Sequence, residues 1–197
     1  RPYSTDRMIN NFTGMLGRFD NGDWYKNRYE TSQGYKAVIG ATGQSVTPGE
    51  NIIYNGYKAD ILDYMWRVYR YNVDEKSNRV ISSITNTYNV TPNFSLRARF
   101  SNDFTSQNTD DRRATEKPLA FGYSGEYIST NELYSVLYGE FLATYVKKLT
   151  DKMELTVRGG YNATNSTFNL TSRSTDGGLS SENFFDVAAS VNKANSD

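Results

Sequence analysis

The second half of the chain carries long runs in which apolar and polar residues alternate, and this pattern constrains the fold more than any other feature. Between Phe94 and Phe104, apolar residues occupy every second position except Asn102, and polar residues fill the positions between them. The stretch from Met153 to Ala163 alternates in the same way. Because successive side chains of a β-strand point to opposite faces, each run predicts a strand with one apolar and one polar face.

The predicted strands are joined by connections that alternate between short and long. Short polar turns lie at Thr91 to Asn93 and at Thr150 to Lys152, whereas 107–125 and 171–181 are long polar connections. Outer-membrane barrels have short periplasmic turns and long extracellular loops, so we expect the short turns on the periplasmic side and the long connections outside. We therefore expect strands at 79–90, 94–106, 133–149, 153–170 and 183–193.

Two all-β folds are compatible with this alternation. Strands longer than ten residues favour antiparallel strands of a large transmembrane β-barrel with long extracellular loops, since strands of soluble proteins average about 5–6 residues. A soluble β-sandwich that acts as a carbohydrate-binding module is the alternative. In a barrel one set of residues faces lipid and another faces water, whereas a sandwich buries the first set against a second sheet. The first set is Leu96, Phe100, Leu137, Phe141, Leu155 and Val157, and the second is Arg97, Arg99, Glu154 and Arg158.

The composition excludes several classes of function. The chain has no His and no Cys, which excludes Ser-His-Asp triads, thiolate catalysis, disulfides and His- or Cys-ligated metal sites. Lys plus Arg and Asp plus Glu both number 22, so the chain lacks the positive excess that nucleic-acid binding needs. The adjacent carboxylates of Asp110 and Asp111 are flanked by arginines, which predicts local ion pairing rather than acid–base chemistry. We therefore predict a protein that is not an enzyme, with no cofactor and no nucleic-acid partner.

Residues 1–78 lack sustained alternation and are expected to form an extracellular loop region. Within them, 7–19 shows the spacing of a short amphipathic helix, Tyr64 to Tyr71 is an aromatic cluster, and Asn72 to Asn78 reads as a polar turn. Residues 79–197 are expected to supply the barrel strands and their loops.

Two groups of residues are candidates for substrate binding. The aromatic rings of Trp24, Tyr25 and Trp66 can stack on sugar rings, and packing beneath loops or an interfacial aromatic girdle is the alternative for them. Arg97 and Arg99 can bind an anionic ligand, and lining a wet lumen in pairs with nearby carboxylates is the alternative for them. We expect no metal site, because the acidic run at 20–23 lacks the spaced third ligand and closing Glu of a calcium loop.

The chain from Tyr64 onward resembles the barrel of SusC-like TonB-dependent transporters of the Bacteroidetes. In that family an aromatic motif ending in Tyr-Trp precedes a strand that ends in Tyr-x-hydrophobic-Thr, a short turn, and a strand with Leu-x-x-Arg and a closing Asp-Phe or Asp-Tyr. The matching residues here are Asp63-Tyr64-Met65-Trp66, Asn78-Arg79, Tyr88-Asn89-Val90-Thr91, Leu96-Arg97-Ala98-Arg99 and Asp103-Phe104. Of the aromatic motif, only the Trp keeps its register.

The resemblance implies a function in nutrient uptake at the bacterial outer membrane. It implies import of a glycan or oligopeptide, energised by the TonB complex and shared with a SusD-like surface lipoprotein, with the lipid bilayer as a further partner. The five or six predicted strands cannot close a barrel, and an open edge is not tolerated in lipid. We therefore expect the chain to be an internal segment of a longer barrel.

Overall fold

The computed structural model describes residues 22–38 and 56–196, in which β-strands predominate. Two helices, α2 (Gly22–Lys26) and α3 (Gly56–Arg70), precede the strands. The long strands are β1 (Tyr71–Thr91), β2 (Phe94–Arg113), β3 (Glu126–Thr150) and β4 (Met153–Ser174), and β5 (Asn195–Ser196) is short. Short 3₁₀ turns lie at η1 (Leu119–Phe121) and η2 (Val187–Ala189). The predicted helix at 7–19 falls outside the described residues.

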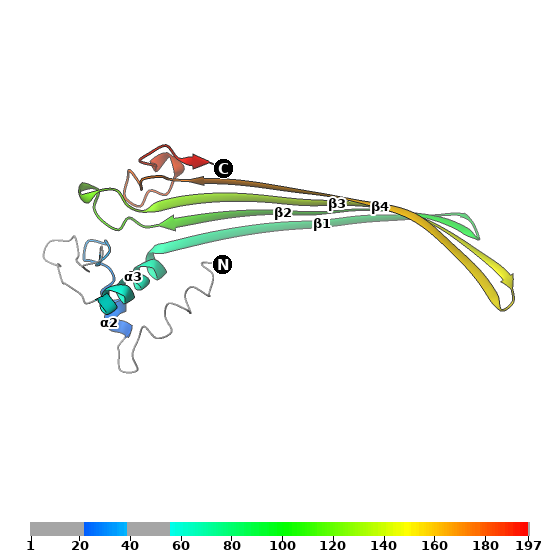
Figure 1. Ribbon diagram of the computed structural model, residues 1–197, viewed down its shortest axis with the longest axis horizontal. Helices are drawn as coiled ribbons and strands as arrows, with labels where there is room; N and C mark the ends of the chain where they lie inside the picture. The colour runs from blue at the N-terminus through cyan, green and yellow to red at the C-terminus, as the bar shows by residue number, and fades with distance from the viewer. Residues whose placement is uncertain (1–21, 39–55, 197) are drawn as a thin grey trace. The chain divides into compact units, whose positions relative to one another are not determined.

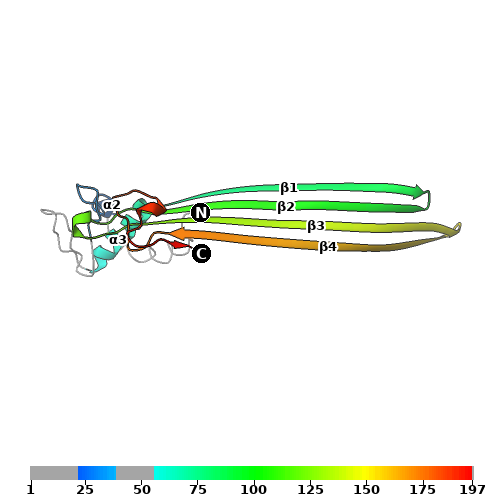
Figure 2. The same ribbon diagram turned by 90° about the horizontal axis from the view of Figure 1, so that it is seen from above.

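The strands form one sheet in which every strand lies beside its neighbour in the chain. The order is β1-β2-β3-β4-β5, and Figures 1 and 2 show the four long strands side by side in that order. β5 pairs antiparallel with the end of β4, with Arg173 opposite Ser196. The prediction of an antiparallel all-β fold is confirmed, and in the described part of the chain the sheet is open.

The chain divides into two compact units. The first, which we name the loop unit, comprises 1–76, 108–130 and 171–197, and the second, the sheet unit, comprises 77–107 and 131–170. Each long strand contributes residues to both units. The predicted division at 78/79 therefore separates α3 from most of the strand residues. However, the connections at 108–130 and 171–197 belong to the same unit as residues 1–76.

The loop unit holds the buried apolar core, which is built around α3. Ile61, Leu62, Met65 and Trp66 recur at helical spacing and are buried on one face of the helix. Tyr25 of α2 and Val38 pack against Ile61, Leu62 and Met65 in one cluster. Trp24, Tyr29 and Ala59 flank this cluster. The basic side chains Arg67 and Arg70 lie in the last turn of α3, where they interact favourably with the helix dipole.

The four long strands extend further than their apolar patterns predict. β1 begins at Tyr71, so the predicted turn at 72–78 is wrong, and β2 continues to Arg113 instead of ending at 106. Polar residues are retained in these extensions because their side chains pair with one another. Asp110 and Asp111 pair with Arg112 and Arg113, Arg113 also pairs with Glu126, and Tyr127 donates to Asp110. The predicted ion pairing around Asp110 and Asp111 is confirmed, although it lies on a strand.

The predicted final strand at 183–193 is wrong. Asn183 has a left-handed backbone (φ 52°), and the carboxylate of Asp186 accepts a 2.7 Å hydrogen bond from the Ala188 backbone N–H, which caps η2. Such local side-chain bonds offer the backbone an alternative to strand pairing. Only Asn195 and Ser196 join the sheet.

The two faces of the sheet unit differ in charge. Arg79 of β1 pairs with Asp103 of β2 at 2.5 Å, and Arg97 of β2 pairs with Glu140 of β3 at 2.7 Å. A Cβ added at Gly160 of β4 would meet Leu142 of β3, two positions from Glu140, which places Gly160 on the same side. These contacts define a charged face, and residues at the positions between them define the opposite, apolar face.

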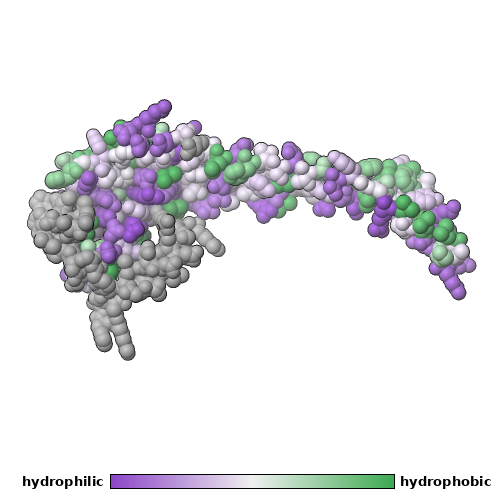
Figure 3. All heavy atoms as spheres, viewed as in Figure 1, coloured by the Kyte–Doolittle hydropathy of each residue, from purple (hydrophilic) through white to green (hydrophobic). Residues whose placement is uncertain are grey.

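The apolar face of the sheet unit is exposed along its length. The large side chains on it range up to 76% exposure at Tyr161, and no residue of the sheet unit is buried. Figure 3 shows these apolar residues at the surface beside hydrophilic ones. Among the strand residues of the sheet unit, Lys147 is the one charged residue that alternation places on this face. Its exposed members are Val80, Ile84, Tyr88, Val90, Phe100, Phe104, Leu137, Phe141, Tyr145, Leu149, Met153, Leu155, Val157 and Tyr161.

The predicted separation of faces is confirmed for β2, β3 and β4, the strands that hold the residues of the two sets. Each residue that we expected on the lipid side lies on the apolar face, and each that we expected on the water side lies on the charged face. The described residues contain no second sheet that covers the apolar face.

Candidate functional site

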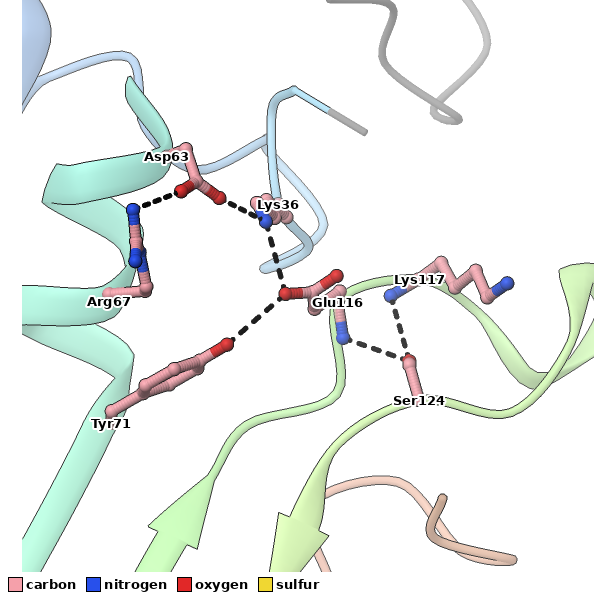
Figure 4. A network of polar contacts seen from close by, with 7 residues as sticks. All are labelled: Lys36, Asp63, Arg67, Tyr71, Glu116, Lys117 and Ser124. Carbon is pink, nitrogen blue, oxygen red and sulfur yellow. Dashed lines mark hydrogen bonds and ion pairs between the residues drawn. The ribbon is translucent and has the colours of Figure 1, made fainter. Parts of the chain in front are cut away.

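A polar network around Lys36 lies in the loop unit, where it joins three segments of the chain (Figure 4). Lys36 is only 9% exposed, and its ammonium lies 2.5 Å from a carboxylate oxygen of Asp63 and 3.0 Å from one of Glu116. Asp63 also pairs with Arg67 one turn along α3, at 2.6 Å. The phenol of Tyr71 donates to Glu116 at 3.3 Å. A buried cation thus holds two carboxylates from different segments.

Backbone contacts support the same network. The Lys36 N–H donates to the Glu116 carbonyl at 3.0 Å, and the Ser124 hydroxyl accepts from the N–H groups of Glu116 and Lys117. Burial, and then the negative charge of Glu116, raise the pKa of the Tyr71 phenol far above its usual value. Tyr71 therefore stays a neutral donor, and the network fixes the 114–125 connection against α3.

A second pairing attaches the 27–38 segment to the end of α3. Arg70 makes a bidentate contact with Glu30, of which the Nε to Oε2 distance is 2.9 Å, and its guanidinium lies 5.8 Å from the ring centre of Trp66. Tyr29 stacks on Tyr69 at 5.2 Å between ring centres. Burial, followed by the charge of Glu30, raises the pKa of the Tyr29 phenol. These groups also serve to anchor the segment.

Replacing Lys36 by Met is expected to destabilise the loop unit by about 1–3 kcal/mol. The change removes the ammonium that Asp63 and Glu116 share and leaves them with Arg67 and the Tyr71 phenol as partners. These remaining partners and the partial exposure of both carboxylates keep the loss below that of a fully buried pair. Hydrogen exchange at the amides of Glu116 and Lys117 measures the loss. Lys117→Met is the control, and Glu116→Gln in the Lys36→Met background should restore part of the protection. Equal losses for Lys36→Met and Lys117→Met would contradict a role for the network.

The two long connections pack on each other within the loop unit. The Asn183 side-chain oxygen accepts from both the N–H and the hydroxyl of Thr115, at 3.0 and 3.2 Å. Glu182 accepts from the Leu119 N–H at 3.1 Å and from the Tyr35 phenol at 2.9 Å. Leu179 is fully buried beside this contact, so the predicted extracellular loops form an ordered structure.

Aromatic side chains are exposed on these same connections. Phe121, Tyr123 and Phe184 are each more than half exposed. Phe121 lies in η1, which the Leu119–Glu182 hydrogen bond attaches to the 180–184 segment. The β-carbon of Tyr123 lies within 3.0 Å of where a Cβ at Gly178 would be. Sequence reasoning missed these residues, because an isolated aromatic in a polar connection has no periodic pattern to mark it.

The structure places the predicted aromatic site residues in the core of the loop unit. Trp66 is fully buried and Tyr25 is 1% exposed, so their rings present no face to a ligand. Trp24 is half-buried, meets Tyr25 edge-on at 4.9 Å, and carries the Arg28 guanidinium 4.8 Å above its ring. Trp24 and Tyr25 are brought together, whereas Trp66 packs beside Tyr29. The burial of Tyr25 and Trp66 is what the packing alternative predicts.

The predicted arginines belong to the sheet unit. Arg97 and Arg99 are exposed on the charged face, and Arg97 pairs with Glu140, whose other oxygen accepts from the Tyr138 phenol at 2.7 Å. This pairing matches the wet-lumen alternative for Arg97. In the described ranges, no group of three or more acidic residues is arranged to hold a metal ion.

No helix among the described residues is both long enough and apolar enough to cross a bilayer. A scan against protein-family models finds no matching family, and a search of curated proteins finds no significant match.

Proposed function

We propose that the chain supplies strands to the wall, and loops to the outer rim, of a transmembrane β-barrel in the bacterial outer membrane. The observation that carries this proposal is the sheet unit, a single layer with one charged face and one apolar face on which Lys147 is the charged residue. A barrel wall has this construction, with lipid outside and a hydrated lumen inside.

The length of the apolar face fits a bilayer. On β2 the apolar alternation runs from Phe94 to Phe104, and on β4 from Met153 to Ala163. At about 3.3 Å per residue, eleven residues span about 36 Å, and a strand tilt of about 45° reduces this to about 25 Å. The apolar band of an outer-membrane barrel is about 25 Å tall.

The free energy of exposing this face in water supports the same proposal. Burying a large apolar side chain stabilises a protein by about 1.5–3 kcal/mol. The apolar face exposes about half of each of its large side chains. Its contact with water therefore costs on the order of 15 kcal/mol. That equals the whole net stability of a typical domain, whereas contact with lipid removes the cost.

The strand edges favour additional strands beside this sheet. In the described residues, β1 has no partner on its outer edge, and β4 is paired on its outer edge only near Arg173 and Ser174. Unpaired backbone N–H and C=O groups are not tolerated in hydrocarbon. In the proposed barrel, neighbouring strands satisfy both edges.

We assign to this barrel the function that the family resemblance implies. The chain takes part, without catalysis, in TonB-dependent import of a large nutrient, a glycan or an oligopeptide, together with a SusD-like lipoprotein. In this proposal the turns at Thr91–Asn93 and Thr150–Lys152 face the periplasm, and the connections at 107–125 and 171–181 face outward. There, Phe121, Tyr123 and Phe184 are available for stacking on nutrient or for contact with the lipoprotein.

Single cysteines along β4 should report lipid and water alternately. The chain has no Cys, so each introduced thiol is the one labelled site. Labelled with an environment-sensitive fluorophore in phosphatidylcholine vesicles, Leu155→Cys, Val157→Cys and Tyr161→Cys should emit at shorter wavelength and be quenched by lipid-borne quenchers. Thr156→Cys, Arg158→Cys and Asn162→Cys should be quenched by aqueous iodide, because alternation places them on the charged face.

The soluble sandwich predicts a different labelling result. A face buried against a second sheet would shield odd positions from both quenchers and leave the protein in solution after vesicle flotation. Uptake is tested separately, in cells that carry the protein, by supplying glycan or peptide and measuring TonB-dependent accumulation. Turnover of either substrate by the purified protein would contradict the non-catalytic role.

A further inference from the structure

The tip of the β3–β4 hairpin is basic. Lys147, Lys148 and Lys152 lie within six residues around the turn, and all three are exposed. Asp151 and Glu154 offset part of this charge. No ion pair joins either carboxylate to these lysines, since the ion pairs of the sheet unit are those of Arg79 and Arg97. The tip therefore presents three separate ammonium groups.

The tip of the β1–β2 hairpin provides an internal comparison. Its residues Asn89 to Phe94 contain no charge, although the turn is built in the same way. In each turn a Thr hydroxyl accepts a 3.3 Å hydrogen bond from the backbone N–H two residues later. The Asn93 N–H donates to Thr91 in the first turn, and the Lys152 N–H donates to Thr150 in the second. The charge at the second tip is therefore not needed to close the turn.

Lys147 occupies an unusual position for a charged residue. Alternation places it on the apolar face of the sheet unit, between the exposed Tyr145 and Leu149. A lysine at the end of an apolar band extends its ammonium to the headgroup layer while its methylene groups stay on the apolar surface. Alternation places Lys148 on the charged face, one residue closer to the turn, and Lys152 lies within the turn.

We propose that this tip binds the phosphate groups of anionic phospholipids, with Lys147, Lys148 and Lys152 as the contacting residues. The proposal rests on the membrane assignment above and adds the lipid class that the wall selects. Charge complementarity identifies the occupant, since an ammonium group on the apolar face, with two more beside and within the turn, matches a layer of phosphates beside hydrocarbon.

The test compares vesicles of phosphatidylcholine alone with vesicles in which about a third of the lipid is phosphatidylglycerol, at low ionic strength. The complete barrel that contains these strands is used, because the open edges of an isolated segment are not tolerated in lipid, and flotation gives the partition coefficient. Unaltered protein should prefer the anionic vesicles, and Lys147→Gln/Lys148→Gln/Lys152→Gln should lose that preference, by about fivefold per lysine and roughly 100-fold in total. The matched control is Lys26→Gln/Lys76→Gln/Lys193→Gln, which removes the same charge from exposed positions of the loop unit.

Each result separates this inference from the membrane assignment. Loss of the preference in the tip variant alone supports the inference, and so does its loss when salt is raised. Equal preference in the tip variant and the control, with normal insertion into phosphatidylcholine, overturns lipid selection and leaves the membrane assignment standing. Failure of the unaltered protein to insert into either vesicle overturns both.

Discussion

In the proposed barrel, Val157→Arg should lower the free energy of unfolding by about 2–4 kcal/mol, the cost of an arginine on the lipid face near the midplane. Val157 lies on the apolar face, is 53% exposed, and is close to the centre of the alternating run from Met153 to Ala163. Unfolding from vesicles in urea, followed by the gel shift between folded and unfolded forms, measures the loss.

Thr156→Arg is the matched control, because it introduces the same side chain one residue away on the charged face. We expect it to change the free energy of unfolding by under about 1 kcal/mol. Met153→Arg lies at the end of the apolar run and should cost less than Val157→Arg, since the effect declines toward the interface. A larger loss for Thr156→Arg than for Val157→Arg would reverse the two faces and contradict the barrel.

Trp66→Ala should destabilise the loop unit by about 3–5 kcal/mol. Trp66 is fully buried on α3, where its ring lies 6.4 Å from that of Tyr29, and truncating a buried aromatic removes its transfer free energy and leaves a cavity. Hydrogen exchange of the α3 amides should accelerate accordingly. Trp66→Phe should lose much less, because the indole N–H has no acceptor among the described residues and its removal breaks no hydrogen bond.

Tyr69→Ala serves as the comparison on the same helix. Tyr69 is 47% exposed, so its truncation should cost under about 1.5 kcal/mol, mainly through its stacking on Tyr29. If Trp66 contacted a sugar rather than packed, Trp66→Ala would leave the exchange of the α3 amides unchanged and weaken only ligand binding. This pair therefore tests the packing role of Trp66 directly.

The strands were predictable where one face is apolar and not where both faces are polar. Phe94 to Phe104 and Met153 to Ala163 gave correct strands, correct faces and correct turns. The ends at 71–78 and 107–113 were missed, because ion pairs such as Arg113–Glu126, rather than apolar periodicity, accompany the extension of the strands. Sequence periodicity records burial against lipid or core, and it carries no signal for pairing between polar side chains.

The loop unit was the least predictable part. The apolar residues of α3 have helical spacing, but the Tyr and Trp residues of 64–71 favour β-structure in isolation, and tertiary packing with Tyr25 and Val38 decides the outcome. The Lys36 network joins residues 80 positions apart, from Lys36 to Glu116, which no local pattern reveals. For the same reason, the burial of Trp66 and Tyr25 became visible only in the folded arrangement.

The order of the strands has a consequence for how the chain acquires this structure. Each long strand pairs with the strand before it, and two of the three pairings start from a turn of two residues. Closing so short a loop costs little chain entropy, and a sheet of consecutive hairpins avoids the slow search for distant partners. Pairing can therefore proceed along the chain, from the β1–β2 hairpin to β3 and then to β4. The growing edge then offers each new strand a template beside the residues that precede it.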